Sequence, residues 1–186
     1  MLSKTFWPQS GFATLGAGFY ATPGDPLAPG QRRLDSAVGY LQLGMVSDAH
    51  AEIDALPEEL TDSADVLSLR ACVYLEAGAW EALREVAGLL AAACPGESQH
   101  WIWLGHATRR CQSLAAARRI LKDALVLHRD EAAIHFNLAC YAAQAGDLTA
   151  AREHLVDAIR LHPEVPRMAL KDPDLEPLWH DRRSPS

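Results

Sequence analysis

Three side chains that could bind a metal recur at intervals of 34 positions: Cys72, His106 and Cys140. Thiolate and imidazole are ligands that zinc prefers. If each of the three lies on a separate repeat, however, packed helices keep them about 8–10 Å apart, whereas an ion needs its ligands at about 2.0–2.3 Å. We therefore expect no metal site and no cofactor.

The cysteines are equally poor candidates for catalysis. A catalytic thiol needs a base held against it and a preorganised oxyanion site, and no motif in the sequence supplies either. The four cysteines, at positions 72, 94, 111 and 140, include no CxxC pair. Buried free thiols in a reducing compartment are expected rather than a disulfide framework. We predict a protein that is not an enzyme.

The 34-residue spacing extends through most of the chain, from position 30 onward. Gly44 and Gly78 are one period apart, and Gly146 lies two periods further on. Another column contains only small residues, as expected where two helices nearly touch: Ala37, Ala71, Gly105 and Ala139. A fixed period of this length indicates a repeat architecture.

Each repeat has the pattern of two helices joined by a turn. Apolar residues recur with helical periodicity on both sides of the glycine position. Glycine suits a helix C-terminus because the left-handed conformation penalises a Cβ, and Pro95 and Pro163 cannot continue the helices that precede them. The expected helices are 31–43, 46–56, 63–77, 79–93, 97–111, 113–127, 131–145 and 148–161.

These residues resemble the tetratricopeptide repeat (TPR), whose pattern is W-x2-L-G-x2-Y, then A-x3-F, then P. The third repeat matches at Trp101, Leu104, Gly105, Ala117 and Leu121. The resemblance implies an all-α, right-handed α-solenoid of about four helix-turn-helix units plus a C-terminal capping helix. The units are 30–63, 64–97, 98–131 and 132–163, followed by a capping segment and tail at 164–186. In this pattern His135 takes the place of the leading aromatic residue, so packing explains it.

The two ends of the chain differ from the repeats. The tail, ALKDPDLEPLW, resembles the ends of bacterial repeat proteins in which a short segment covers the last apolar face. We expect Asp172 and Asp174 near the start of its final turn. Five apolar residues are expected to pack onto the last helix pair: Met168, Leu170, Leu175, Leu178 and Trp179. Residues 1–29 are rich in Gly and Pro and predict a flexible or irregular leader, with an export signal or an aromatic segment docked on the body as alternatives.

The resemblance also implies a binding surface, because the first helix of each TPR unit lines a concave groove. The expected groove residues are Leu34, Val38, Leu41, Ser68, Cys72, Leu75, Ile102, His106, Arg109, Arg110, Phe136 and Cys140. This set is largely apolar, and it has Leu34, Val38 and Ser68 at positions where some TPR proteins use Lys, Asn and Arg to clamp a terminal carboxylate. It suits an amphipathic helix or an extended segment with one or two acids that contact Arg109 and Arg110. Alternatively, these arginines only complement the helix dipole.

Charge and composition limit the classes of partner. The net charge is −7 and the 17 basic residues are scattered, which disfavours nucleic acid. No apolar run reaches the length of a membrane span. We expect a cytoplasmic scaffold or adaptor that binds a protein or peptide in the groove. The alternative is a dedicated chaperone for a secreted client, similar to the class II chaperones of type III secretion.

Overall fold

The computed structural model describes residues 29–180, and the regular structure in this range consists of helices only. The leader expected at 1–29 and the tail beyond His180 lie almost entirely outside the described residues. The described chain divides into two compact units, residues 29–94 and residues 95–180. No helix within this range is long and apolar enough to cross a membrane.

Residues 29–94 form two helical hairpins. The first pairs α2 (Pro29–Gln42) with α3 (Val46–Asp54), and the second pairs α4 (Ala64–Ala77) with α5 (Trp80–Ala93). A single 3-10 turn, η1 (Glu58–Leu60), lies in the connection between the hairpins. Ser63 begins α4 because its hydroxyl accepts a hydrogen bond from the Val66 amide.

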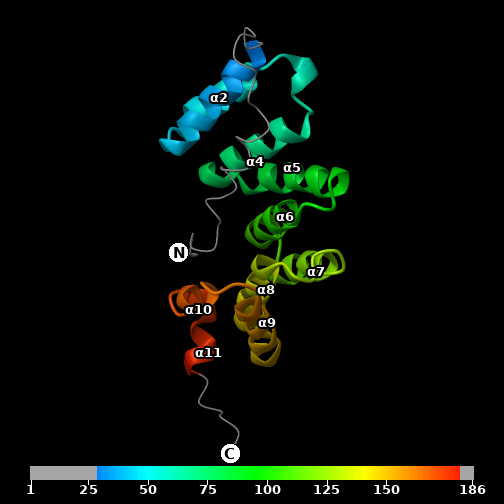
Figure 1. Ribbon diagram of the computed structural model, residues 1–186, viewed down its shortest axis with the longest axis vertical. Coiled ribbons are helices and arrows are strands. Elements are labelled where there is room, and N and C mark those ends of the chain that lie inside the picture. The colour runs from blue at the N-terminus through cyan, green and yellow to red at the C-terminus, as the bar shows by residue number, and fades with distance from the viewer. Residues whose placement is uncertain (1–28, 181–186) are drawn as a thin grey trace, which may run out of the picture. The chain divides into compact units, whose positions relative to one another are not determined.

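Residues 95–180 form two further hairpins and a C-terminal cap (Figure 1). The hairpins are α6 (Ser98–Cys111) with α7 (Leu114–Ala124), and α8 (Ala132–Gln144) with α9 (Leu148–Leu161). The cap consists of α10 (Val165–Ala169), η2 (Pro173–Leu175) and α11 (Glu176–His180). It packs against α8 and α9, which closes the end of this unit.

The turns inside the hairpins follow the chemistry expected from the glycine positions. Gly44, Gly78 and Gly146 have φ of 73°, 69° and 77°, the left-handed region in which a side chain would be strained. Gln112 occupies the equivalent position of the third hairpin with φ −128° and ψ −87°, so that turn is made without a left-handed residue. The glycine column is thus explained by backbone geometry in three of the four hairpins.

The expected helices are confirmed, and all but one of their ends lie within two residues of the expected positions. The helix expected at 46–56 ends at Asp54, and the one expected at 113–127 ends at Ala124. After Ala124 the backbone makes tighter bonds, from the Val126 amide to the Asp123 carbonyl and from the Leu127 amide to the Ala124 carbonyl. The side chains of Val126 and Leu127 are exposed. Another helical turn here would therefore gain no stability from the burial of these side chains.

The small-residue column lies where the helices approach most closely. Ala37, Ala71 and Ala139 are fully buried. At Gly105 an added Cβ would lie 2.9 Å from the Leu121 Cδ2 atom, because α6 and α7 are in direct contact there. The size restriction in this column therefore comes from helix packing within each hairpin.

The cap packs with a different set of residues from that expected. Leu175 and Leu178 are buried and Met168 packs at the edge of the core, as predicted. The predictions for Leu170 and Trp179 are wrong, since these side chains are 71% and 47% exposed. In α10 the buried residues are Val165 and Ala169, four positions apart on one side of the helix. Leu170 directly follows the buried Ala169, so its side chain points away from the core. Trp179 likewise follows the buried Leu178 and points toward solvent.

Candidate binding site on the first helices

We call the groove residues predicted above the first-helix face of each unit. In residues 29–94 this face belongs to α2 and α4, and in residues 95–180 to α6 and α8. Seven of its twelve side chains are buried: Leu34, Leu41, Ser68, Cys72, Ile102, Phe136 and Cys140. Four are partly exposed, namely Val38, Leu75, His106 and Arg109, and Arg110 is exposed. The apolar area open to a partner is therefore smaller than the residue types suggest.

The first-helix face of residues 95–180 already holds a segment of the chain itself. The guanidinium of Arg109 on α6 donates two hydrogen bonds to the Asp174 carboxylate, at 2.6 and 3.1 Å. The Gln144 side-chain amide, at the end of α8, donates to the Asp174 carbonyl oxygen at 3.0 Å. Both charged side chains of the ion pair are only 13% exposed. A bidentate pair of this kind fixes orientation as well as adding stability.

Arg109 is held from a second side by an aromatic ring. Its guanidinium carbon lies 5.0 Å from the ring centroid of Tyr141, a cation–π geometry. Burial lowers the pKa of Arg109, but the hydrogen bonds and charge of Asp174 raise it above its usual value. The arginine expected to meet a partner's acid thus meets an acid of the same chain.

Asp172 fixes the backbone that presents Asp174. Its Oδ1 accepts a hydrogen bond from the Asp174 amide at 2.9 Å and so begins η2, which places both acids near the start of the final turn, as expected. Burial raises the pKa of Asp172, although this hydrogen bond opposes the shift. The conformation of this segment therefore depends on a hydrogen bond within the cap as well as on Arg109.

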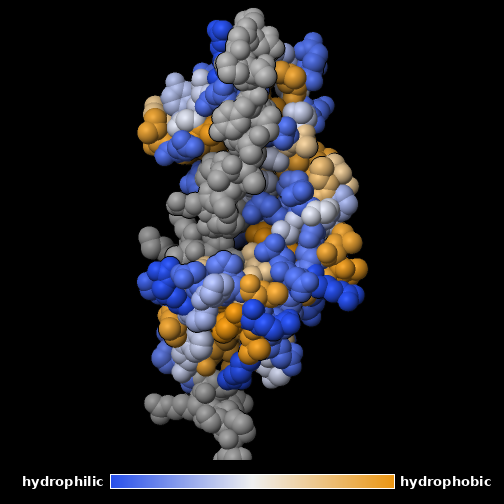
Figure 2. Space-filling view, viewed as in Figure 1, coloured by the Kyte–Doolittle hydropathy of each residue, from blue (hydrophilic) through white to orange (hydrophobic). Residues whose placement is uncertain are grey.

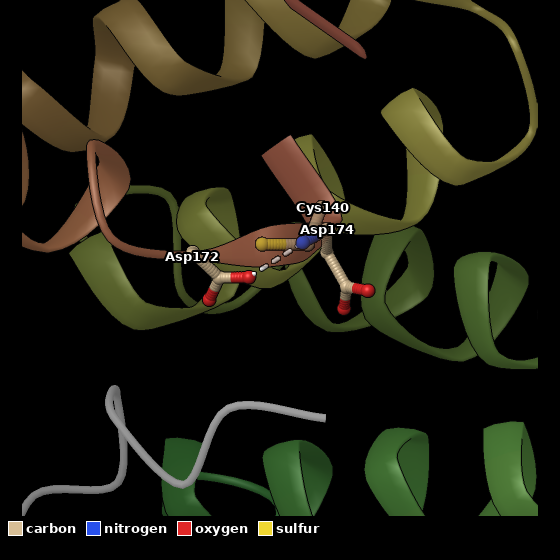
Figure 3. A group of neighbouring side chains, drawn as sticks. All are labelled: Cys140, Asp172 and Asp174. Atoms are coloured by element: carbon tan, nitrogen blue, oxygen red, sulfur yellow. Dashed lines mark hydrogen bonds between the residues drawn. The ribbon is translucent and has the colours of Figure 1, made fainter. Parts of the chain in front are cut away.

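Cys140 joins these two acids to form a compact cluster (Figure 3). One ligand atom each from Cys140, Asp172 and Asp174 lie within 4.8 Å of one another. A cationic side chain, that of Arg109, already neutralises Asp174, and burial raises the pKa of the Cys140 thiol well above its ordinary value. A protonated thiol is neither a nucleophile nor a good metal ligand. The cluster accordingly serves to hold the end of the chain.

His106 lies near this cluster and is neutral at physiological pH. Burial, followed by the charges of Arg110 and Arg109, lowers its pKa to about 4. In residues 29–94, burial raises the pKa of Cys72 to about 12, so this thiol is also protonated. These uncharged groups give the first-helix faces an apolar character between their few charges.

Surface side chains elsewhere are mixed in character. Figure 2 shows that, on the face in view, apolar groups are interspersed with hydrophilic ones. Exposed large apolar residues lie on α5 and α9 and in the segments that follow α2 and α7, and they include Leu43, Leu89, Val126, Leu127 and Val156. Scattered exposure of this sort is ordinary for a folded protein.

Two features of the site were missed in the sequence. The sequence pattern places Asp172 and Asp174 only in a terminal turn, whereas both side chains are buried and that of Asp174 contacts the first-helix face. The available signal was Arg109, a basic residue in an otherwise largely apolar set of positions, together with two acids spaced two residues apart in the cap. His135, for which the repeat pattern predicts only packing, also contacts His154 on α9.

Comparisons with known proteins agree with this architecture. No family model matches the chain, and no curated protein matches its sequence. A solved structure of MamA protein is similar with a TM-score of 0.67 at 15% identity, covering 81% of this chain and 81% of that one. MamA from residue 41 to its end, from Desulfovibrio magneticus RS-1, gives a TM-score of 0.65 at 19% identity over 72% and 75% of the two chains.

A TPR protein is among the similar structures. The thermophilic TPR protein TTC0263 of Thermus thermophilus has a TM-score of 0.62 at 22% identity, covering 80% of this chain and 86% of that one. At such identities the likeness establishes the fold and leaves function to the site. The chain thus has an all-α helical repeat fold of the TPR type.

Proposed function

We propose that this protein is a non-enzymatic, cytoplasmic interaction module that binds a peptide or helix of a partner protein on its first-helix faces. One observation carries the proposal. The face of α6 and α8 already holds residues 172–175 of the chain by a bidentate arginine–carboxylate pair, a hydrogen bond from the Gln144 side chain and burial of Leu175. This is the combination of polar anchoring and apolar burial by which proteins recognise peptides.

The chemistry of the held segment suggests what a partner would present. It places an acid directly before a buried leucine, Asp174 and Leu175, with a second acid two positions earlier. A partner segment with one or two acids beside apolar residues would match this face, as expected from the sequence. The free thiols at all four cysteines fit a reducing compartment.

The proposal is tested by charge substitution at a partly exposed first-helix position. Phe136 is buried, so changing it would test stability rather than binding. Leu75 on α4 is partly exposed, and Leu89 on α5 is an exposed leucine that lies outside the first-helix face. Leu75→Asp and Leu89→Asp therefore form a matched pair.

The experiment compares partners recovered from native lysate by wild-type protein and by the two variants, after circular dichroism has shown that each is folded. We expect partners that are retained by Leu89→Asp and lost with Leu75→Asp. An identical set of partners with both variants would contradict binding on this face. Hydrogen exchange of a recovered partner separates this module from the chaperone alternative, because a chaperone's client would be held unfolded.

A further inference from the structure

Two histidines face each other across the last helical hairpin. His135 lies on α8 and His154 on α9, with their Nδ1 atoms 3.3 Å apart. The ring centroids are 5.5 Å apart and the planes are tilted by 51°. The two ligand nitrogens of a tetrahedral zinc ion, each bound at about 2.0–2.1 Å, are separated by about 3.3 Å. The 3.3 Å separation is that of a hydrogen bond between the two rings, and it equals the separation that two zinc ligands require.

A backbone carbonyl fixes the tautomer of His135. Its Nε2 atom lies 3.0 Å from the carbonyl oxygen of Arg129. A carbonyl can only accept, so Nε2 carries the proton, and the Nδ1 of the neutral ring presents a lone pair toward His154. Metal-binding histidines commonly donate their second nitrogen to a carbonyl or carboxylate in this manner, which orients the ring.

A carboxylate lies beside the His135 ring. Asp157 follows His154 by three residues on α9, and its Oδ2 atom is 3.7 Å from the His135 Nδ1 atom. Its other oxygen, Oδ1, accepts a hydrogen bond from Arg160 at 3.2 Å. Asp157 is 40% exposed, so the side chain can turn toward an ion, and water can complete the coordination.

Charged side chains of both signs lie around the pair of histidines. Burial lowers the pKa of His154, and His135 and Lys122 lower it further, while Asp157 and Glu153 oppose the shift. The Nδ1 atom of His154 can coordinate an ion when the ring carries its proton on Nε2. The carboxylates of Asp157 and Glu153 offset the positive charges of Lys122 and Arg160.

We propose that His135, His154 and Asp157 form a binding site for a divalent transition-metal ion such as Zn²⁺. The site differs from the arrangement rejected on sequence grounds, in which the ligands belonged to different repeats. Here the two helices of a single hairpin bring the ligands together. The ion would cross-link α8 and α9, so its binding would stabilise the folded chain.

The test is the melting temperature of the full chain in EDTA and in saturating ZnCl₂, for wild type, His154→Ala and His180→Ala. His154 is partly exposed, so its loss leaves the fold intact, and His180 is an exposed histidine remote in sequence from the site. We expect zinc to raise the melting temperature of wild type and His180→Ala by a few degrees, about 2–4 °C for each kcal/mol. His154→Ala should show no rise.

A second measurement uses Co²⁺ as a spectroscopic probe. One equivalent should give the visible absorption of a cobalt ion with nitrogen ligands in wild type and His180→Ala but not in His154→Ala. The proposal is overturned if wild type shows neither a zinc-dependent rise nor cobalt absorption. It is equally overturned if His154→Ala responds as wild type does, since binding would then occur elsewhere.

Discussion

Arg109 links two parts of the chain that are 65 residues apart. Its guanidinium contacts Asp174 of the cap and the ring of Tyr141 on α8, although the residue itself belongs to α6. Removing one member of a buried pair leaves the other charge without compensation, which costs more than the pair contributes. Loss of this contact should therefore destabilise the cap more than the loss of an exposed ion pair would.

A double-mutant cycle measures that dependence. Arg109→Met and Asp174→Leu should each lower the free energy of unfolding by about 3 kcal/mol, because each leaves one charge buried and unpaired. The double variant should recover much of this loss, since no unpaired charge remains. Urea unfolding monitored by circular dichroism gives the values. Single-variant losses below about 1 kcal/mol, typical of exposed pairs, would contradict the structure.

His106 makes stability depend on pH. Its folded-state pKa is lowered to about 4 by burial and by Arg110 and Arg109, compared with about 6.5 in the unfolded chain. Between these values the unfolded chain binds more protons, so stability is complete above pH 6.5 and is lost as the pH falls toward 4. The shift corresponds to a loss of about 2 kcal/mol between pH 7 and pH 5.

Replacing His106 with Gln isolates this contribution. The unfolding free energy of wild type should fall between pH 7 and pH 5 by about 2 kcal/mol more than that of His106→Gln. His154, whose pKa is also lowered, remains in both proteins. Asp172, whose pKa is raised, favours the folded state as the pH falls and also remains. An equal fall in the unfolding free energy of the two proteins would show that folding does not lower the pKa of His106.

The cap consists of short helices in which few residues face the core. Val165 and Ala169 of α10, Leu175 of η2 and Leu178 of α11 are buried against the last hairpin. Leu170 lies between them in sequence but points away. Leu175 and Leu170 are thus the same residue type in a buried and an exposed position. A comparison of substitutions at the two positions isolates the effect of packing.

Leu175→Ala and Leu170→Ala test the packing of the cap. Loss of the buried side chain at position 175 should cost about 2–5 kcal/mol through lost burial and the remaining cavity. The change at position 170 should cost less than about 0.5 kcal/mol, as at other surface sites. Thermal unfolding provides the comparison. Equal effects of the two changes would mean that Leu170 contacts the core.

At the scale of the whole molecule, the chain consists of similar hairpins in two compact units. Helix limits, left-handed glycines and small-residue positions were all predictable, because each depends on residues within one repeat. The candidate site was less predictable. Its helical positions could be assigned from the repeat pattern, but the burial of Phe136 and Cys140 depends on what packs over them.

The sequence by itself determined the repeat, since a period of 34 residues and the chemistry of glycine and proline act over a few neighbouring positions. The tertiary structure alone decided that Asp174 binds Arg109 and that His135 meets His154. These pairs are separated by 65 and 19 residues, and their atoms approach only after the helices have packed. Hydrogen bonds act over about 3 Å, so the contacts depend on side-chain geometry that periodicity does not contain.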